Sequence, residues 1–177
     1  PGGAKIRRVL YVDASGAEIA PEPSPSAMDS LARAATIVYA MGSLYTSIIP
    51  VLIVPGFGDA IASKRGPKVL LLNGTYDRET AGLKASQIVS AVLDGLKRHA
   101  SCERPPSAYI TTVLHPKGCQ IALDRPAIES MGIAVEAVSA RMQPLTDGSA
   151  RHGFTEGKDV VYFDEHALAK RLFEISK

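Results

Sequence analysis

The most informative segment of this 177-residue chain joins a short apolar run to a glycine turn. It reads Thr36-Ile37-Val38-Tyr39-Ala40-Met41-Gly42-Ser43-Leu44-Tyr45-Thr46-Ser47. Residues 36–41 are nearly unbroken in apolar side chains and rich in β-branched and aromatic types, which is typical of a strand buried on both faces. A helical stretch that Pro50 disturbs is expected from Tyr45. Strand, turn and helix in this order indicate an α/β fold.

The turn Gly42–Ser47 has the features of a ligand-binding loop. Gly42 directly follows the strand, so its backbone can adopt a positive φ and leaves room for a ligand. Ser43 can cap the helix, whose free N–H groups then present the positive end of the helix dipole. Thr46 and Ser47 add hydroxyl donors, and together these groups can hold a phosphate oxygen. An ordinary Gly-Ser cap without a ligand explains the same residues equally well.

Further strands and helices alternate along the rest of the chain. Strands are expected at residues 68–72, 108–114, 133–139 and 159–163, and helices at about 24–34, 55–65, 84–99, 124–131 and after Asp164. The clearest helix is 84–99, because its apolar side chains recur at spacings of three and four. The alternation predicts an α/β fold with a mostly parallel sheet, as a single domain over residues 1–177.

Two segments stand outside this alternation. Lys5–Val12 and Ala17–Ala20 surround a Gly-bearing turn, which predicts an N-terminal hairpin. Residues 143–158 are polar, Gly-bearing and aperiodic, which predicts a surface loop or a partly disordered segment.

Two more loops follow predicted strands, at the sheet edge where open α/β folds bind ligands. Asn73 could bond a base or a sugar hydroxyl, Asp77 could hold Mg²⁺, and Arg78 could pair with phosphate. We expect Asn73 to be functional, whereas Glu79 fits a solvated turn before the long helix. In the third loop, His115 stands at a strand end, where a surface or satisfied histidine is commoner than a catalytic base.

Composition and missing motifs argue against several functions. The net charge is +2 with both signs interspersed, which favours neither nucleic acid nor an anionic membrane as a partner. No apolar run reaches the roughly 20 residues of a membrane span, and without a signal peptide a cytoplasmic location is expected. The Cys and His spacing fits no zinc pattern. A triad of Ser43, His115 and Asp124 has little support, because the G-x-S-x-G turn is absent.

One stretch resembles a known family. From Gly42 to Pro50 the chain runs Gly-Ser-Leu-Tyr-Thr-Ser-Ile-Ile-Pro, and Val54-Pro55-Gly56 follows. This is similar to the Gly-Ser-Leu-Tyr-Thr-Ser-Ile-x-Pro motif in the family of the 2-phospho-L-lactate transferase CofD and the gluconeogenesis factor YvcK. The fungal branch is also similar at Arg8-Val9-Leu10-Tyr11, Gly16-Ala17-Glu18-Ile19, Leu71-Leu72-Asn73-Gly74 and Asp77-Arg78-Glu79-Thr80. The resemblance covers roughly residues 6–96, and its motif is specific for membership but not for substrate.

The resemblance implies a Rossmann-like three-layer α/β/α fold, in which this turn contacts a nucleotide or its phosphates. It carries over Gly42, Ser43, Thr46 and Ser47 as ligand contacts, and Asn73 more loosely. In the transferase branch such a site moves phospholactate from a guanosine-type dinucleotide onto a deazaflavin, with Mg²⁺. In the regulator branch it binds a UDP-sugar and need not catalyse a reaction.

Two departures from the family pattern bear on the site. Its N-terminal Gly-Gly-Gly-Thr-Gly strand–turn does not occur in this chain, and Ala40-Met41 replaces the Gly-Pro before Gly42. The first departure implies a C-terminal piece that needs an N-terminal half of the same protein to complete the site. We therefore expect a nucleotide-binding transferase, a non-catalytic sensor of a UDP-sugar, or a surface that only contacts the missing half. A second copy of the same chain, in a homodimer, is a further possible partner.

Overall fold

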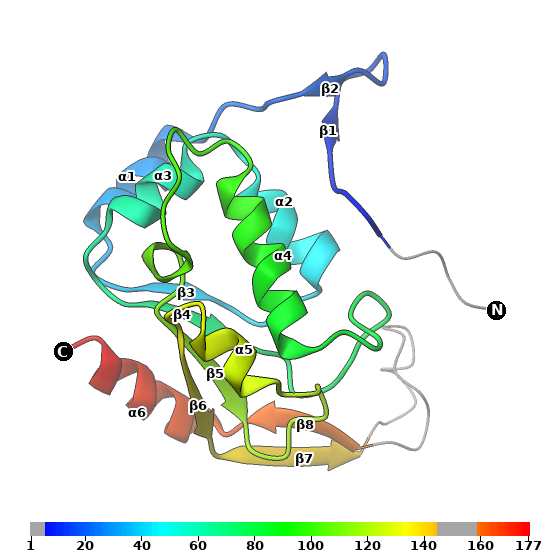
Figure 1. Cartoon of the computed structure of the whole chain (residues 1–177), viewed down its shortest axis with the longest axis vertical. Coiled ribbons are helices and arrows are strands. Elements are labelled where there is room, and N and C mark those ends of the chain that lie inside the picture. Colours follow the sequence, from blue (N-terminus) through cyan, green and yellow to red (C-terminus); the bar gives the residue numbers. More distant parts are fainter. Residues whose placement is uncertain (1–5, 145–158) are drawn as a thin grey trace.

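Four parallel strands form the central sheet of the computed structural model, which describes residues 6–144 and 159–177. The strands lie in the order β3 (Ile37–Tyr39), β4 (Lys68–Leu71), β5 (Thr112–Pro116) and β6 (Ala134–Val138) (Figure 1). The register sets Tyr39 beside Leu70, and Leu71 beside Leu114. Because all four strands run in one direction, the loops that follow β3, β4 and β5 meet at one edge of the sheet.

The helices that connect these strands cover one face of the sheet. The π-helix η1 (Leu44–Ile48), α2 (Ile49–Leu52) and α3 (Phe57–Ser63) join β3 to β4, α4 (Ala85–Lys97) joins β4 to β5, and α5 (Arg125–Glu129) joins β5 to β6. Their apolar side chains, such as Ile49 and Val89, pack with Leu70 and Val113 in the main core. Crossovers of one hand between strands in sequential order give this one-sided arrangement.

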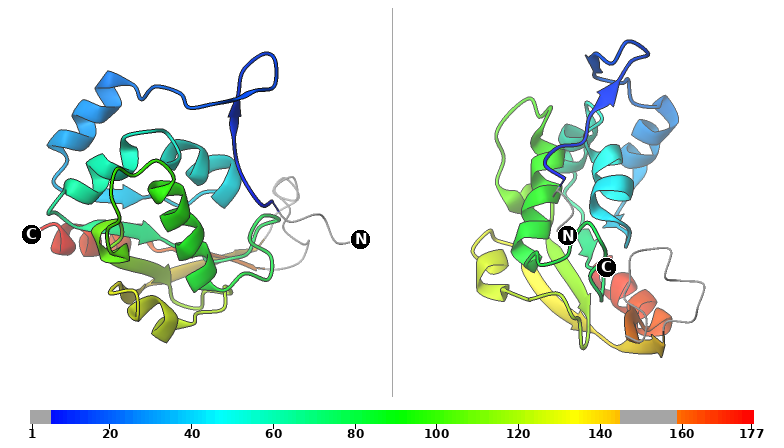
Figure 2. Two further views of the ribbon diagram at one scale, coloured as in Figure 1. Left: turned by 45° about the horizontal axis from the view of Figure 1, so that its top comes forward. Right: turned by 90° about the vertical axis from the view of Figure 1, so that its right-hand side faces the viewer.

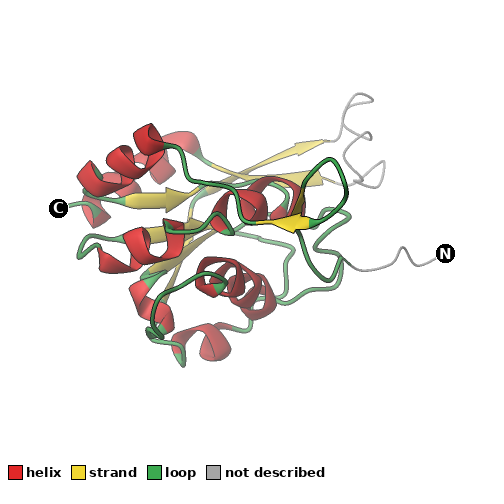
Figure 3. Ribbon diagram, turned by 90° about the horizontal axis from the view of Figure 1, so that it is seen from above, coloured by secondary structure: helices red, strands yellow, loops and turns green. Residues whose placement is uncertain are grey.

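The opposite face of the sheet is covered by the C-terminal helix α6 (Glu165–Ile175). Val69 and Leu71 of β4 point to this side and pack with Leu168 and Leu172, whereas Leu70 points to the main core. The strand is thus buried on both faces, as its sequence predicts. Figure 2 shows the same layers from two other sides, and Figure 3 separates strands from helices by colour. The predicted α/β/α architecture is confirmed.

Two antiparallel pairs and one helix complete the described chain. They are β1 (Tyr11–Val12) with β2 (Glu18–Ile19), β7 (Ala140–Pro144) with β8 (Asp159–Phe163), and α1 (Pro25–Arg33). The β1–β2 hairpin projects from the body (Figure 1), and the Tyr11 hydroxyl anchors it by donating to the Pro50 carbonyl at 2.8 Å. The N-terminal hairpin is confirmed, although its strands are shorter than predicted.

Two sequence-based boundaries are wrong. The strand predicted at 108–114 begins only at Thr112, because Pro105 and Pro106 start the 3₁₀ turn η2 (Pro106–Ala108). The loop predicted at 143–158 is wrong at its first two residues, which belong to β7. The rest of that prediction, residues 145–158, lies outside the described residues.

Candidate functional site

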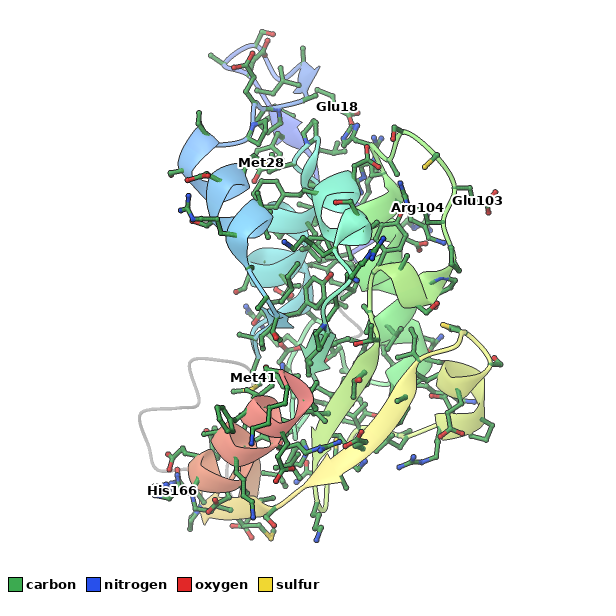
Figure 4. The ribbon with its side chains drawn as sticks, turned by 90° about the vertical axis from the view of Figure 1, so that its left-hand side faces the viewer. Glu18, Met28, Met41, Glu103, Arg104 and His166 are labelled. Carbon is green, nitrogen blue, oxygen red and sulfur yellow. The ribbon has the colours of Figure 1, made fainter. Side chains whose placement is uncertain are left out.

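A cavity of about 420 Å³ opens at the sheet edge where β3 and β4 end. Three segments line it: the glycine turn, the loop after β4, and strand β8. Its lining residues are Met41, Gly42, Ser43, Ser47, Asn73, Gly74, Thr75, Asp77, Val160, Val161, Tyr162 and Phe163. Met41, labelled in Figure 4, is 47% exposed beside it. Two of the three loops singled out in the sequence therefore meet at one cavity, whose volume lies in the usual range of ligand pockets.

The glycine turn is built differently from its prediction. Gly42 is not among the glycines with positive φ, so the expected conformation is wrong. A Cβ at this position would lie 3.3 Å from Ile48 Cδ1 and 3.3 Å from Ser47 Cβ, so close packing within the turn favours glycine. Ser43 occupies the predicted N-cap position, with φ −64° and ψ 128°, but its side chain makes no capping hydrogen bond.

The N–H groups at the start of η1 are occupied by a side chain from another loop. Glu79 Oε2 accepts hydrogen bonds from the N–H groups of Tyr45 at 2.7 Å and Thr46 at 3.3 Å. A carboxylate at a helix N-terminus satisfies free donors and complements the dipole. The prediction of Glu79 as part of a solvated turn is therefore wrong: it caps the helix in the place expected for phosphate.

The first two N–H groups of the turn have no such partner. Within residues 6–144 and 159–177, the N–H groups of Gly42 and Ser43 donate to no acceptor. Both residues line the cavity. Among the described residues that line the cavity, the free N–H groups of the turn thus belong to Gly42 and Ser43, which precede the first residue of η1.

Asn73 and Asp77 give the loop after β4 its shape. Asn73 Nδ2 donates to the Gly42 carbonyl at 3.1 Å, which ties this loop to the glycine turn. Asp77 Oδ1 accepts from the N–H groups of Glu79 and Thr80, both at 2.9 Å, and from the Thr80 hydroxyl at 2.7 Å. This turn holds Glu79 where it caps η1. Asn73 and Asp77 both line the cavity.

Strand β8 closes the cavity on its remaining side. Thr75 Oγ1 accepts from the Val161 N–H at 3.0 Å. The Val161 carbonyl lies so close to Gly74 that a Cβ there would stand 2.1 Å from its oxygen. Only glycine allows this approach. No pattern in the sequence indicated that β8 would reach the site, because the contact joins residues far apart in the chain.

Several sequence-predicted residues lie elsewhere. Thr46 and Arg78 are exposed and do not line the cavity. His115 and Asp124 do not line it either. Asp124 accepts from the Ser86 N–H at 2.9 Å and from its hydroxyl; although burial opposes the change, these bonds lower the pKa of Asp124. Ser43 lines the cavity without His115 or Asp124, so these three residues form no triad there.

His115 allows a test of its buried position. Burial lowers the pKa of His115 below 6.5; the Pro116 carbonyl opposes this shift and the Arg125 charge adds to it. Protonation therefore favours the unfolded chain, so stability is intact above the unfolded pKa and is lost as the pH falls below it. We expect the free energy of unfolding to fall between about pH 7 and pH 5 more steeply in the wild type than in His115→Gln, measured by urea denaturation. Equal slopes would contradict this burial.

The described residues contain no group of three or more His, Cys, Asp or Glu side chains placed to hold a metal ion. In the same part of the chain, no single helix has the length and apolarity of a membrane span. The two helical segments Leu44–Leu52 and Phe57–Ser63 are bent by 77° to each other. Taken together they have the length and apolarity of a membrane span, by length and composition only.

Comparison with known proteins assigns the family. The family model described as 2-phospho-L-lactate transferase CofD matches residues 2–146, most of the chain. The chain belongs to the CofD family. Solved structures of protein BH3568 from Bacillus halodurans, described as a member of the UPF0052 family, share the fold of this CofD family chain. The TM-score is 0.64 at 20% identity, over 86% of this chain and 47% of the other.

Curated relatives agree with this CofD family assignment. The chain is 30% identical over 150 residues to the uncharacterized protein YNL011C of Saccharomyces cerevisiae, with 77% of this chain and 34% of that protein covered. It is 26% identical to the gluconeogenesis factor of Bacillus subtilis, over 99% of this chain and 52% of that protein. The chain thus spans about a third of the yeast protein and about half of the bacterial one. The yeast match agrees with the predicted fungal branch.

Proposed function

We propose that the cavity binds part of a phosphorylated nucleotide or nucleotide-sugar. The carrying observation is that the glycine turn and the loop from Asn73 to Asp77 meet around one cavity at the carboxyl edge of a parallel sheet. Ligands of open α/β sheets bind at this edge. The family of the chain favours the same kind of ligand, since its model is described by a phospholactate transferase.

The turn contacts the ligand phosphate through its first residues in this proposal. The N–H groups of Gly42 and Ser43 are free in the described chain, and the Ser43 and Ser47 hydroxyls stand beside them at the cavity wall. Backbone N–H groups and hydroxyls together suit a phosphate oxygen. Glu79 stabilises the turn by accepting hydrogen bonds from the N–H groups of Tyr45 and Thr46.

The proposed ligand site has two possible roles, and the first is a transferase site, in which Mg²⁺ is expected to take part. Asp77 is the one carboxylate among the described residues that line the cavity. One carboxylate is a fitting protein contribution when ligand phosphates supply other oxygens, because Mg²⁺ is commonly held in this way. If Mg²⁺ takes part, Asp77 is the described residue that would hold it.

A second version is a non-catalytic sensor of a UDP-sugar. Asp77 is the one carboxylate among the described lining residues, which include no histidine, lysine, arginine or cysteine, and one of its oxygens already accepts three hydrogen bonds. A lining of this kind provides binding groups rather than an acid–base pair. Several relatives are named gluconeogenesis factors, and the sensor version extends that kind of role to this chain.

We also propose that a further segment of the longer protein pairs with β3. Ile37 donates to the Pro67 carbonyl on the β4 side, so Val38 directs its N–H and C=O to the other edge of β3, which no strand within residues 6–144 and 159–177 covers, as parallel pairing requires. Val38 is 39% exposed. The curated relatives are two to three times as long as the chain, and a strand of that additional length could cover this edge. A second copy of the chain is the alternative partner.

The proposal is tested on the full-length protein by thermal denaturation with UDP-glucose, GDP and NAD, each with and without Mg²⁺. We expect at least one ligand to raise the melting temperature, and product formation only with Mg²⁺ would assign the transferase version. Gly42→Val should abolish the shift, because its branched side chain crowds Ser47 and Ile48, while far-ultraviolet circular dichroism stays unchanged.

Ala81→Val is the matched control, since Ala81 is exposed and outside the cavity. It should keep the ligand-induced shift. A shift that survives in Gly42→Val would remove the turn from the site, and no shift with any ligand in the wild type would refute nucleotide binding.

A further inference from the structure

The lining of the cavity indicates which part of the ligand it holds. On one side stand two serine hydroxyls, the Asn73 amide and the Asp77 carboxylate, and on the other stands β8 from Val160 to Phe163. Among the described lining residues Asp77 alone carries a charge, and that charge is negative. Phosphate groups are usually met by Arg, Lys, helix N-termini or metal ions. The inner part of the cavity is therefore suited to a neutral, hydroxyl-bearing group.

Asp77 has an oxygen available for such a group. The side chain is nine-tenths buried, at 9% exposed. Its Oδ1 accepts three hydrogen bonds within the loop, whereas Oδ2 has no partner among residues 6–144 and 159–177. Oδ2 is not fully buried, so it is open to the cavity that Asp77 lines, where a ligand hydroxyl can donate to it. Because the three donors fix the carboxylate in place, its free oxygen is preorganised.

A negative side chain also repels phosphate from this part of the site. Glu79 already fills the N–H groups of Tyr45 and Thr46 from the same loop, so the helix start offers an anion no further attraction there. The N–H groups of Gly42 and Ser43 belong to the cavity lining and have no acceptor within residues 6–144 and 159–177, so they are the backbone donors of the turn that we assign to phosphate. This division leaves phosphate at the turn and hydroxyl groups at Asp77.

We infer that the cavity receives the hydroxyl-bearing ring of the nucleotide or nucleotide-sugar, with Asp77 Oδ2 accepting from a vicinal diol. A carboxylate that accepts from ring hydroxyls is an established way for sheet-edge sites to hold a ribose. The apolar β8 wall packs against the less polar face of the ring. The inference rests on the proposed function, and it assigns Asp77 to the diol rather than to a metal ion.

The test compares Asp77→Asn with the wild type in the full-length protein. Asparagine keeps the Oδ1 acceptor that shapes the loop, but it replaces the free oxygen with an N–H donor. The probes are UDP-glucose, UDP and 2′,3′-dideoxy-UDP, titrated calorimetrically in EDTA. We expect Asp77→Asn to weaken binding of a diol-bearing probe about 10- to 100-fold, as for the loss of a hydrogen bond to a charged group, and to leave 2′,3′-dideoxy-UDP unaffected.

The two sources of a diol are separated by the same titrations. A loss with UDP that is absent with 2′,3′-dideoxy-UDP places the ribose at Asp77, and a loss confined to UDP-glucose places the hexose there; either result supports the inference. Asp94→Asn, an exposed carboxylate on α4, removes the same charge elsewhere and should bind all three probes normally.

Three results would overturn the inference while leaving the proposed function intact. The first is an equal loss with all three probes in EDTA, and the second is no loss with any of them. The third is a loss that appears only when the titrations are repeated with Mg²⁺, because Asp77 would then act through the ion. Failure of the wild type to bind any of the three probes, together with no thermal shift with GDP or NAD, is a different outcome, and it would reject both proposals.

Discussion

Replacing Gly74 with alanine should lower the free energy of unfolding by about 3 kcal/mol, at the upper end of overpacking effects. The new Cβ would stand 2.1 Å from the Val161 carbonyl oxygen, 2.8 Å from its carbon and 2.9 Å from Pro116 Cγ. Since the first two are backbone atoms, no side-chain rotation can relieve the contact. Either β8 or the loop after β4 must move.

Neighbouring hydrogen bonds oppose that movement. The Gly74 carbonyl accepts from the Gln120 N–H at 2.8 Å, and the Thr75 hydroxyl accepts from the Val161 N–H at 3.0 Å. Movement of the loop strains the first bond, and displacement of β8 breaks the second and alters a wall of the cavity. Gly74→Ala should therefore lose the ligand-induced thermal shift as well as stability, both measured beside the wild type.

Gly95→Ala is a matched control for the same chemical change. Its Cβ would meet the flexible end of Ile49 at 3.2 Å, and alanine is the better residue inside a helix by roughly 0.5–1 kcal/mol. We expect urea denaturation to give a midpoint near the wild-type value for this variant. A Gly74→Ala midpoint equal to the Gly95→Ala midpoint would show that β8 does not pack against the loop as described.

The sequence predicted the parallel sheet because its strands carry strong local signals. In β4, Val69, Leu70 and Leu71 are all buried, and a strand with two buried faces must be apolar at every position. The long helix α4 could also be predicted from its sequence. The residues expected on its apolar face, Ile88, Val89, Val92 and Leu96, lie in the main core. In these elements the pattern of apolar residues is enough to predict which side chains are buried.

The elements that were missed give no such local signal. In β7, Arg141 to Pro144 are exposed, so the strand lacks apolar alternation and is defined only by its pairing with β8. The same limit applies at the site. The sequence placed Gly42, Ser43, Ser47, Asn73 and Asp77 correctly at the sheet edge, since each follows a recognisable strand. It could not reveal partners that depend on how distant loops pack.

Removing the Glu79 carboxylate should lower the free energy of unfolding by about 2 kcal/mol, the usual range for a charged hydrogen-bonding cap. Glu79→Ala leaves the N–H groups of Tyr45 and Thr46 without their acceptor. Leu44, at the start of the same helix, is buried in the main core, so the disturbed turn affects packing as well as capping. Urea denaturation of both proteins measures the difference.

Glu79→Gln separates the charge from the hydrogen bond. Glutamine keeps an acceptor oxygen on a side chain of the same length, so it should restore part of the stability that alanine loses, whereas the interaction of the negative charge with the dipole is gone. Ligand affinity provides a second distinction. If Glu79 only supports the turn, both variants bind UDP-glucose more weakly, in the order of their lost stability. If Glu79 instead competes with phosphate for the N–H groups of Tyr45 and Thr46, Glu79→Ala binds UDP-glucose more tightly than the wild type although it is less stable. The division of the site into a phosphate-binding turn and a hydroxyl-binding cavity would then be wrong.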